Sequence, residues 1–143
     1  MGFLRIYADF NGIQPSPRNP ERLGVPLDTF GSLRDLSNAG VQLKEKTQLT
    51  IFDWSDEEEN LEGHCEVYFD WRARFWWAEL NESGILYVPK DERVTSTEFL
   101  CLGCRSNLED YFSKHGRSED TKCSTCGTLI TMAIAPPENN STN

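Results

Sequence analysis

The sequence predicts a mainly β protein with one short helix, followed by a small unit that four cysteines hold together. Three observations lead to this fold class. Apolar and polar residues alternate over several short segments of residues 1–94, one window has helical spacing, and two Cys-x-x-Cys pairs lie near the C-terminal end. A chain of 143 residues is long enough for one modest core and one small additional unit.

The first part of the chain predicts a strand followed by a long loop. Apolar residues stand at every second position of 4–10, which is the period of a half-buried strand. Between residues 11 and 26 this pattern stops and four prolines appear. Because proline neither donates a hydrogen bond to a sheet nor continues a helix, we expect a proline-rich surface loop over 11–26.

A short helix is predicted over residues 29–40. Ser32 and Asp35 resemble a capping box, two leucines one turn apart share a face, and Gly40 fits a C-terminal stop. A helix of about two turns is not stable alone. We therefore expect it to pack on the sheet.

Four more strands are predicted after the helix. Their patterns cover residues 49–54, 61–71, 75–80 and 85–88. Short strands with one helix favour a small barrel or a curled antiparallel sheet, and an open sheet covered by the helix gives almost the same pattern. Through its first strand, its Leu-x-x-Leu helix and the strand pair that follows, this part resembles small SH3-like barrel proteins of uncharacterised bacterial type.

Two Cys-x-x-Cys pairs, Cys101 with Cys104 and Cys123 with Cys126, are separated by eighteen residues. This spacing matches the template of four-cysteine zinc sites. Two residues between the cysteines of a pair let both thiolates face one point, and two pairs complete a tetrahedron around Zn²⁺. Gly127 can take a positive φ that brings backbone N–H groups toward the sulfurs. The sequence therefore predicts a structural zinc ion on these four cysteines.

Other interpretations of the cysteines are weaker. Two disulfides suit a secreted chain, but the first residues run into a strand pattern without the features of a signal peptide. A redox-active pair begins a helix, whereas the second pair leads into the extended pattern of 128–131. His115, between the pairs, is a weak substitute ligand. The fifth cysteine, Cys65, falls on the apolar face of a strand, where it is expected to be a small buried hydrophobe.

The region 95–131 resembles a zinc ribbon, in which two knuckles with short hairpins clasp one metal ion. The resemblance rests on the four cysteines, Gly103 and Gly127, while Arg105 stands where a glycine often follows the first pair. Because a ribbon this small has almost no core, the metal supplies most of its folding free energy, on the order of 10 kcal/mol or more. The resemblance implies a role in nucleic-acid machinery or in partner docking. Residues 132–143 lack apolar periodicity and predict a disordered tail.

An acidic cluster lies within residues 53–62 and includes Asp56, Glu57, Glu58 and Glu59, with no basic residue among them. It is predicted to be a solvated hairpin tip. The alternatives are an anionic patch for a basic partner or an imitation of nucleic-acid phosphate.

Aromatic residues crowd the next hairpin. Trp76 and Trp77 point to opposite faces of their strand because strand residues alternate, so one fills the core. The other is either an exposed anchor for a partner beside Tyr68 or a residue covered by the zinc unit.

The net charge and the motifs limit the classes of function that the chain can have. The formal charge of −9 disfavours general nucleic-acid binding, which needs a cationic surface. No run of eighteen apolar residues exists, so no membrane span is predicted. Reduced cysteines in metal spacing, without a targeting segment, favour the cytoplasm. Phosphate-binding loops, nucleophile elbows and zinc-protease motifs do not appear, so neither an enzyme nor a small-molecule substrate is predicted.

The leading hypothesis is a non-catalytic, zinc-binding adaptor or accessory subunit that docks on a protein partner through aromatic and acidic surface. The alternative is a factor of nucleic-acid machinery. It would contact nucleic acid through Arg105, Arg117 and Lys122, or occupy a basic groove as a phosphate mimic.

Overall fold

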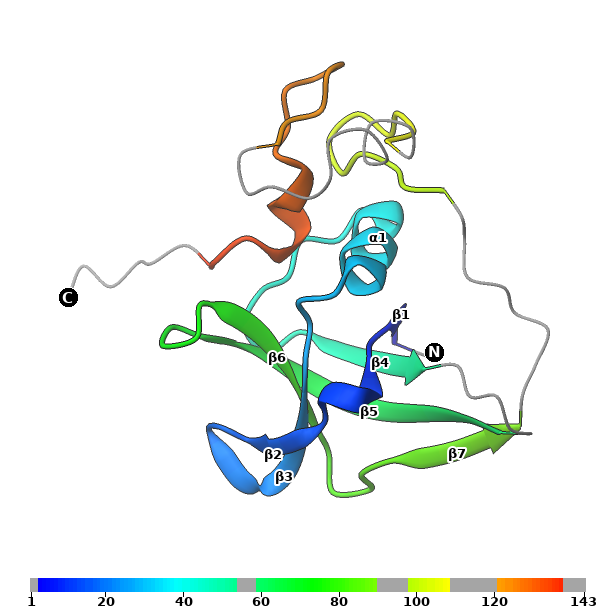
Figure 1. Cartoon of the computed structure of the whole chain (residues 1–143), viewed down its shortest axis with the longest axis vertical. Coiled ribbons are helices and arrows are strands. Elements are labelled where there is room, and N and C mark those ends of the chain that lie inside the picture. Colours follow the sequence, from blue (N-terminus) through cyan, green and yellow to red (C-terminus); the bar gives the residue numbers. More distant parts are fainter. Residues whose placement is uncertain (1–2, 54–58, 90–97, 109–120, 138–143) are drawn as a thin grey trace.

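A computed structural model describes residues 3–53, 59–89, 98–108 and 121–137 of the chain. In this part the mainly β class is confirmed: seven strands form one sheet, with one α-helix and two short 3₁₀ turns (Figure 1). The elements are β1 (Arg5–Tyr7), η1 (Phe10–Gly12), β2 (Gln14–Ser16), β3 (Asn19–Pro26), α1 (Phe30–Ala39), β4 (Gln48–Asp53), β5 (Glu59–Asp70), β6 (Phe75–Leu80), β7 (Leu86–Pro89) and η2 (Ile130–Ile134). No described helix has the length and apolar character that crossing a membrane requires.

The sheet is open and centred on the long strand β5. The strand order is β1-β4-β5-β6-β3-β2, and β7 pairs with β5 beyond the end of β6. All pairs are antiparallel except β1 with β4, which the sequence did not predict to be parallel. Because β1 and β2 end the order, the described strands form the open-sheet alternative and not a closed barrel.

The helix and the cysteine unit lie on the same side of the sheet (Figure 1). Leu33 and Leu36 of α1 are fully buried in one hydrophobic cluster with the sheet residues Ile51 and Val67. Buried residues of the cysteine unit belong to this same cluster, namely Phe99, Cys101, Leu108, Cys123, Ile130 and Ala133. The predicted domain boundary near residue 94 lies outside the described residues.

The prediction of a loop over residues 11–26 is wrong, because β2 and β3 form a hairpin there. Its prolines occupy positions that sheets tolerate. Pro15 lies in the edge strand β2, Pro20 is the second residue of β3, and Pro26 ends β3. The hairpin joins the sheet through β3, whose last three residues pair with β6.

The predicted helix is confirmed, but the predicted capping box is wrong. Thr29 is the N-cap residue, and Gly40 ends the helix with a φ of 73°. Ser32 and Asp35 bind the backbone of β1 instead. Ser32 Oγ donates to Tyr7 O at 2.7 Å, and Tyr7 N donates to Asp35 Oδ2 at 2.8 Å. These side chains satisfy backbone groups on the outer edge of β1, which no strand covers in the described part.

The prediction of a disordered tail is wrong for residues 132–137, which form hydrogen bonds with Leu43 and with Trp76 of β6. Ala133 is fully buried and its carbonyl accepts a hydrogen bond from Leu43 N at 2.9 Å. Trp76 Nε1 donates to Ala135 O at 3.0 Å. Ala133 is therefore part of the core and Ile134 packs against it, which the polar composition of the segment did not indicate.

Candidate metal centre

The four predicted cysteine ligands converge on one point. Their sulfur atoms all lie within 4.8 Å of one another. Cys101 Sγ is 3.6 Å from Cys126 Sγ, and Cys104 Sγ is 3.7 Å from Cys123 Sγ. A tetrahedron with metal–sulfur bonds of about 2.3 Å places its sulfurs about 3.8 Å apart. The arrangement therefore fits a metal ion such as zinc, and all four residues are free cysteines.

Each cysteine pair sits on a knuckle, and the two knuckles repeat one backbone pattern. We call residues 99–108 the first knuckle and 121–130 the second knuckle. In each, the residue after the second cysteine donates its N–H to the carbonyl of the first cysteine, and a β-bridge closes the base. The equivalent bonds are Arg105 N to Cys101 O at 3.0 Å and Gly127 N to Cys123 O at 2.9 Å; the bridges are Leu100–Asn107 and Lys122–Leu129.

The two residues that close the knuckles have the left-handed conformation. Gly127 has a φ of 79°, as its position after the last cysteine predicted. Arg105 has a φ of 67° at the equivalent position of the first knuckle. This conformation costs a non-glycine residue roughly 1–2 kcal/mol. Arg105 therefore needs a compensating interaction, and its side chain supplies one.

The Arg105 guanidinium binds the C-terminal end of helix α1. It donates to Ser37 O at 2.9 Å and to Asn38 O. These carbonyls lie at the negative end of the helix dipole, which favours a nearby cation. The hydrogen bonds compensate for the unfavourable φ, and they attach the first knuckle to the helix.

Ser37 and Asn38 bind the first knuckle as well. Ser37 Oγ donates to Leu100 O at 2.6 Å, and Leu100 N donates to Asn38 Oδ1 at 2.6 Å. Asn38 Nδ2 donates to Glu98 O at 2.9 Å. Helix α1 thus satisfies the outward backbone groups of Leu100. No described residue forms an equivalent bond with Lys122, the counterpart of Leu100 in the second knuckle.

Polar hydrogens surround the sulfurs. Gly103 N donates to Cys101 Sγ at 3.3 Å and Thr125 N to Cys123 Sγ at 3.4 Å. Ser106 Oγ lies 3.2 Å from Cys104 Sγ, and Thr128 Oγ1 lies 3.1 Å from Cys126 Sγ. Such outer contacts orient metal ligands and stabilise their negative charge.

The environment separates the thiol pKa values. Burial raises the pKa of Cys101 to about 11. Burial acts in the same direction on Cys123, but hydrogen bonds from the N–H groups of Cys126 and Thr125 outweigh it and lower the pKa. The side chain and N–H of Thr128 lower the pKa of the exposed Cys126 to about 6. The second knuckle therefore favours thiolates even before metal charge is considered.

Gly103, part of the predicted zinc-ribbon pattern, has a steric role. A Cβ at this position would overlap Thr128 Oγ1 and lie 3.3 Å from Cys126 Sγ. Only glycine allows the first knuckle to approach the second this closely. The close approach brings the two sulfur pairs together.

The three aromatic residues predicted to bind a partner are buried. Trp76 is 1% exposed, Trp77 is 4% exposed and Tyr68 is 6% exposed. Trp76 lies under the C-terminal segment through its bond to Ala135 O, while Trp77 Nε1 donates to Asp70 Oδ2 at 3.3 Å on the opposite face. The exposed anchor that we considered is therefore not formed by these rings.

Of the predicted acidic residues, Glu59 begins β5 and is exposed. Asp56, Glu57 and Glu58 lie outside the described residues, as does His115. Cys65 is buried as predicted, and burial raises the pKa of its thiol to about 12. A buried, protonated thiol is chemically inert.

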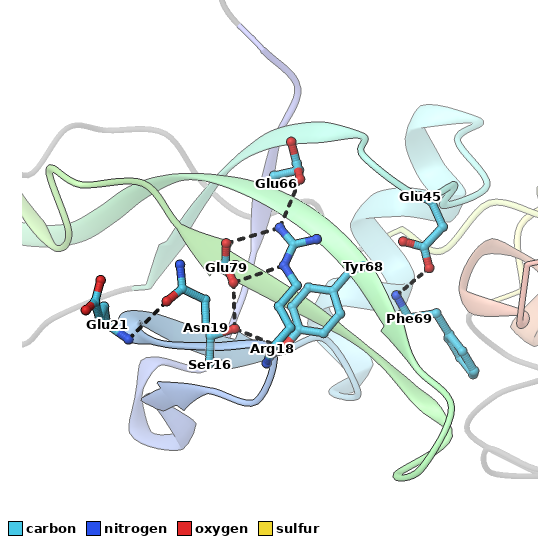
Figure 2. Close-up of polar contacts among 9 residues, drawn as sticks. All are labelled: Ser16, Arg18, Asn19, Glu21, Glu45, Glu66, Tyr68, Phe69 and Glu79. Atoms are coloured by element: carbon cyan, nitrogen blue, oxygen red, sulfur yellow. Dashed lines mark hydrogen bonds and ion pairs between the residues drawn. The ribbon is translucent and has the colours of Figure 1, made fainter.

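The sequence did not reveal a polar cluster on the opposite face of the sheet (Figure 2). Arg18 binds Glu79 through two nitrogens at 3.0 and 3.1 Å and Glu66 at 2.9 Å, with its guanidinium carbon 4.3 Å from the centre of the Tyr68 ring. Buried Ser16 donates to Glu79 Oε1 at 2.8 Å. Burial alone would raise the pKa of Glu79, but the bonds from Arg18 and Ser16 lower it.

This cluster holds the β2–β3 hairpin on the sheet beside an open groove of about 470 Å³. Glu66 and Glu79 are cross-strand partners, and like charges in that position need a cation. That rule is the only signal in the sequence that predicts a basic residue here. It does not identify Arg18, which comes from a segment expected to be a loop.

Comparison with known proteins does not assign the chain to a family. No protein-family model, no curated protein and no solved structure matches it.

Proposed function

We propose that this chain is a non-catalytic zinc protein, in which one structural zinc ion stabilises a unit that docks on a protein partner. The observation that carries the proposal is the convergence of four cysteine sulfurs within 4.8 Å of one another. Soft thiolate ligands in tetrahedral geometry favour zinc among the common divalent ions.

The donor set supports a structural role for the metal. Four thiolates complete the tetrahedral coordination of zinc and leave no position for a substrate or a reactive water. Binding free energy of structural zinc is available to folding, on the order of 10 kcal/mol or more. The two knuckles contribute few large apolar side chains to the core, chiefly Phe99, Leu108 and Ile130, so the metal would supply much of their stability.

The same features support a zinc ribbon as the type of unit. Two knuckles with bridged bases clasp one sulfur cluster, and each begins and ends with paired backbone segments. Thiolate ligands persist in reducing compartments, which is consistent with a cytoplasmic protein.

Docking on a protein is supported by how the unit is held. Arg105, Ser37 and Asn38 attach the first knuckle to α1, whereas residues 124–127 of the second knuckle are exposed. A metal-stabilised loop on a firm support is a suitable binding element because little conformational entropy is lost when it binds.

No observation favours direct nucleic-acid contact through the cysteine unit. Arg105, one of three cations considered for that role, is occupied by the end of α1. Arg117 lies outside the described residues, which leaves Lys122 as the one candidate of the three in the described part that is exposed and not bound to α1.

Two measurements on the reduced, full-length protein test the proposal. Elemental analysis should find one zinc ion per chain, and a Cys126→Ser variant should bind zinc at least tenfold more weakly. Affinity purification from the source cells should recover the same partner with the wild-type chain and lose it with this variant. A protein that folds without bound metal, or that turns over a substrate, would overturn the proposal.

A further inference from the structure

The turn between β5 and β6 exposes one aromatic residue, Trp71. Trp71 is 45% exposed, because β5 ends at Asp70 and the chain turns there. Its ring packs against buried Phe69, with the ring centres 4.7 Å apart and a T-shaped arrangement. One side of the indole is therefore held by Phe69, and the rest of it is open to solvent.

Four exposed cations lie in the two turns at this end of the sheet. Arg72 and Arg74 are exposed in the same turn, and the guanidinium carbon of Arg74 lies 5.2 Å from the centre of the Trp71 ring. Lys44 and Lys46 are exposed in the turn that precedes β4. We call Lys44, Lys46, Trp71, Arg72 and Arg74 the basic hairpin end.

Hydrogen bonds place the two turns side by side. Lys46 N donates to Val67 O at 3.0 Å, and Val67 N donates to Thr47 O at 2.9 Å. Phe69 N donates to Glu45 Oε1 at 2.9 Å, as Figure 2 shows. The lysine turn therefore runs along β5 up to the residues just before Trp71.

Two carboxylates lie within this region, and both already accept hydrogen bonds. Glu45 accepts from Phe69 N. Asp70 accepts from the N–H groups of Arg72 and Ala73 at 2.9 and 3.2 Å and from Trp77 Nε1 at 3.3 Å. Within the described part of the chain, no ion pair involves the four cations of the basic hairpin end. The region therefore has a positive excess in a chain of charge −9.

Charge is distributed unevenly between the two ends of β5. Asp53 and Glu59 lie at the opposite end of β5 from the basic hairpin end, where Glu62 is already paired with Arg5 at 2.7 Å. A partner with an acidic segment is attracted to one end of the sheet and repelled from the other. Electrostatic complementarity of this kind fixes the orientation of docking.

We propose that the basic hairpin end is the docking surface for an acidic segment of a partner protein, with Trp71 as the anchor. This inference rests on the proposed function, because it names the class of partner that the chain takes. Carboxylates of the segment pair with Arg72, Arg74 and the two lysines, while an apolar side chain covers the indole. Tryptophan and arginine are the residues most enriched where interface binding energy concentrates.

The charge distribution favours an acidic protein segment over nucleic acid. Nucleic-acid strands bind through rows of cations that follow many phosphates. The basic hairpin end offers four cations, and a strand longer than a few nucleotides would extend over the acidic remainder of the chain. A short acidic segment avoids this repulsion.

The test selects ligands from a random twelve-residue peptide library with the zinc-loaded protein. Selected peptides should be enriched in aspartate and glutamate and contain an aromatic or leucine residue. Their dissociation constants, measured by fluorescence anisotropy, should rise at least tenfold with Trp71→Ala and with the double variant Arg72→Ala/Arg74→Gly. Glycine suits position 74, where φ is 65°.

Lys122→Ala is the matched control, because it removes an exposed cation from the cysteine unit and should leave peptide affinity unchanged. Peptides without acidic enrichment, or affinity equal in all variants, would overturn the inference. Tighter binding of a twelve-nucleotide thymidine strand than of any selected peptide would also overturn it, in favour of nucleic acid. None of these outcomes would contradict the proposed function, which zinc content and partner recovery by the wild-type chain test separately.

Discussion

The two cysteine knuckles have the same backbone bonding and very different surroundings. The first knuckle is attached to helix α1 through Arg105, Ser37 and Asn38. The tip of the second knuckle, residues 124–127, is exposed, and a Cβ placed on Gly127 would touch no other atom within 4 Å. The first knuckle is bonded to the helix, whereas in the second only the base, with Cys123 and Ile130, is buried in the core and the tip is exposed (Figure 1).

This difference shows how a metal site can be built on a small sheet. A residue with unfavourable φ is tolerated at position 105 because its side chain binds the helix, whereas position 127 has no such contact and is glycine. The first knuckle is positioned by the fold. The tip of the second has no such contact with the helix among the described residues, so in the proposed zinc protein the metal would complete its position.

Removal of zinc should have the largest effect on stability, and the two knuckles should respond differently to it. With a chelator under reducing conditions, stability of the cysteine unit should fall by on the order of 10 kcal/mol, because metal binding supplies its folding free energy. Amide hydrogen exchange should increase first in residues 121–127 and later in 99–108, which α1 retains. Equal loss of protection in both knuckles would show that the helix contacts do not matter.

Arg105→Ala should cost about 2–3 kcal/mol, because it loses hydrogen bonds from a charged group to two helix carbonyls and keeps the unfavourable φ. Urea unfolding at a fixed excess of zinc measures this cost. Arg105→Gly is the matched control, since it loses the same bonds and relieves the backbone. It should be about 1 kcal/mol more stable than Arg105→Ala. If the two variants are equally stable, the φ of residue 105 carries no penalty.

In the metal-free, reduced chain, iodoacetamide should modify Cys126 at least tenfold faster than Cys101 at pH 7.5. The pKa of Cys126 is about 6 and its side chain is exposed, so it is mostly thiolate, whereas burial holds the pKa of Cys101 at about 11. As the pH falls below about 6, protonation should slow the modification of Cys126. Peptide mass spectrometry gives both rates, and faster labelling of Cys101 would contradict the difference between the knuckles.

Ser37→Ala should have the smallest measurable effect, about 1 kcal/mol, because one hydrogen bond to Leu100 O is lost and that carbonyl faces the helix. Ser124→Ala, on the exposed tip of the second knuckle, is the control and should change stability by less than about 0.5 kcal/mol. Equal losses from the two variants, measured by thermal denaturation, would remove the distinction between an attached and a projecting knuckle.

The four cysteines could be predicted as ligands because the pattern that identifies them lies within short stretches of sequence. Two residues between ligands, a left-handed residue at position 127 and a pair of knuckles are short-range features of the chain. The helix over 30–39 and the strands β4 to β7 were predicted for the same reason, since alternation and helical spacing show which face each element buries.

Contacts between distant segments could not be predicted. The hairpin of β2 and β3 forms despite its prolines because β6 and the polar cluster around Arg18 hold it on the sheet. Trp76, Trp77 and Tyr68 are buried because layers cover both faces of β5 and β6, which alternation along one strand does not show. The role of Arg105 depends on the end of a helix more than sixty residues away.

The sequence by itself determined which four cysteines form the candidate metal centre, the mainly β class and the position of most elements, because these follow from residue type and spacing. Only the tertiary structure decided which surfaces remain free. It buried the aromatic residues that had been candidates for binding, attached one knuckle to α1, and brought two turns with exposed cations together at the end of the sheet where Trp71 lies. Burial and charge clustering arise when distant segments pack together, so no local pattern records them.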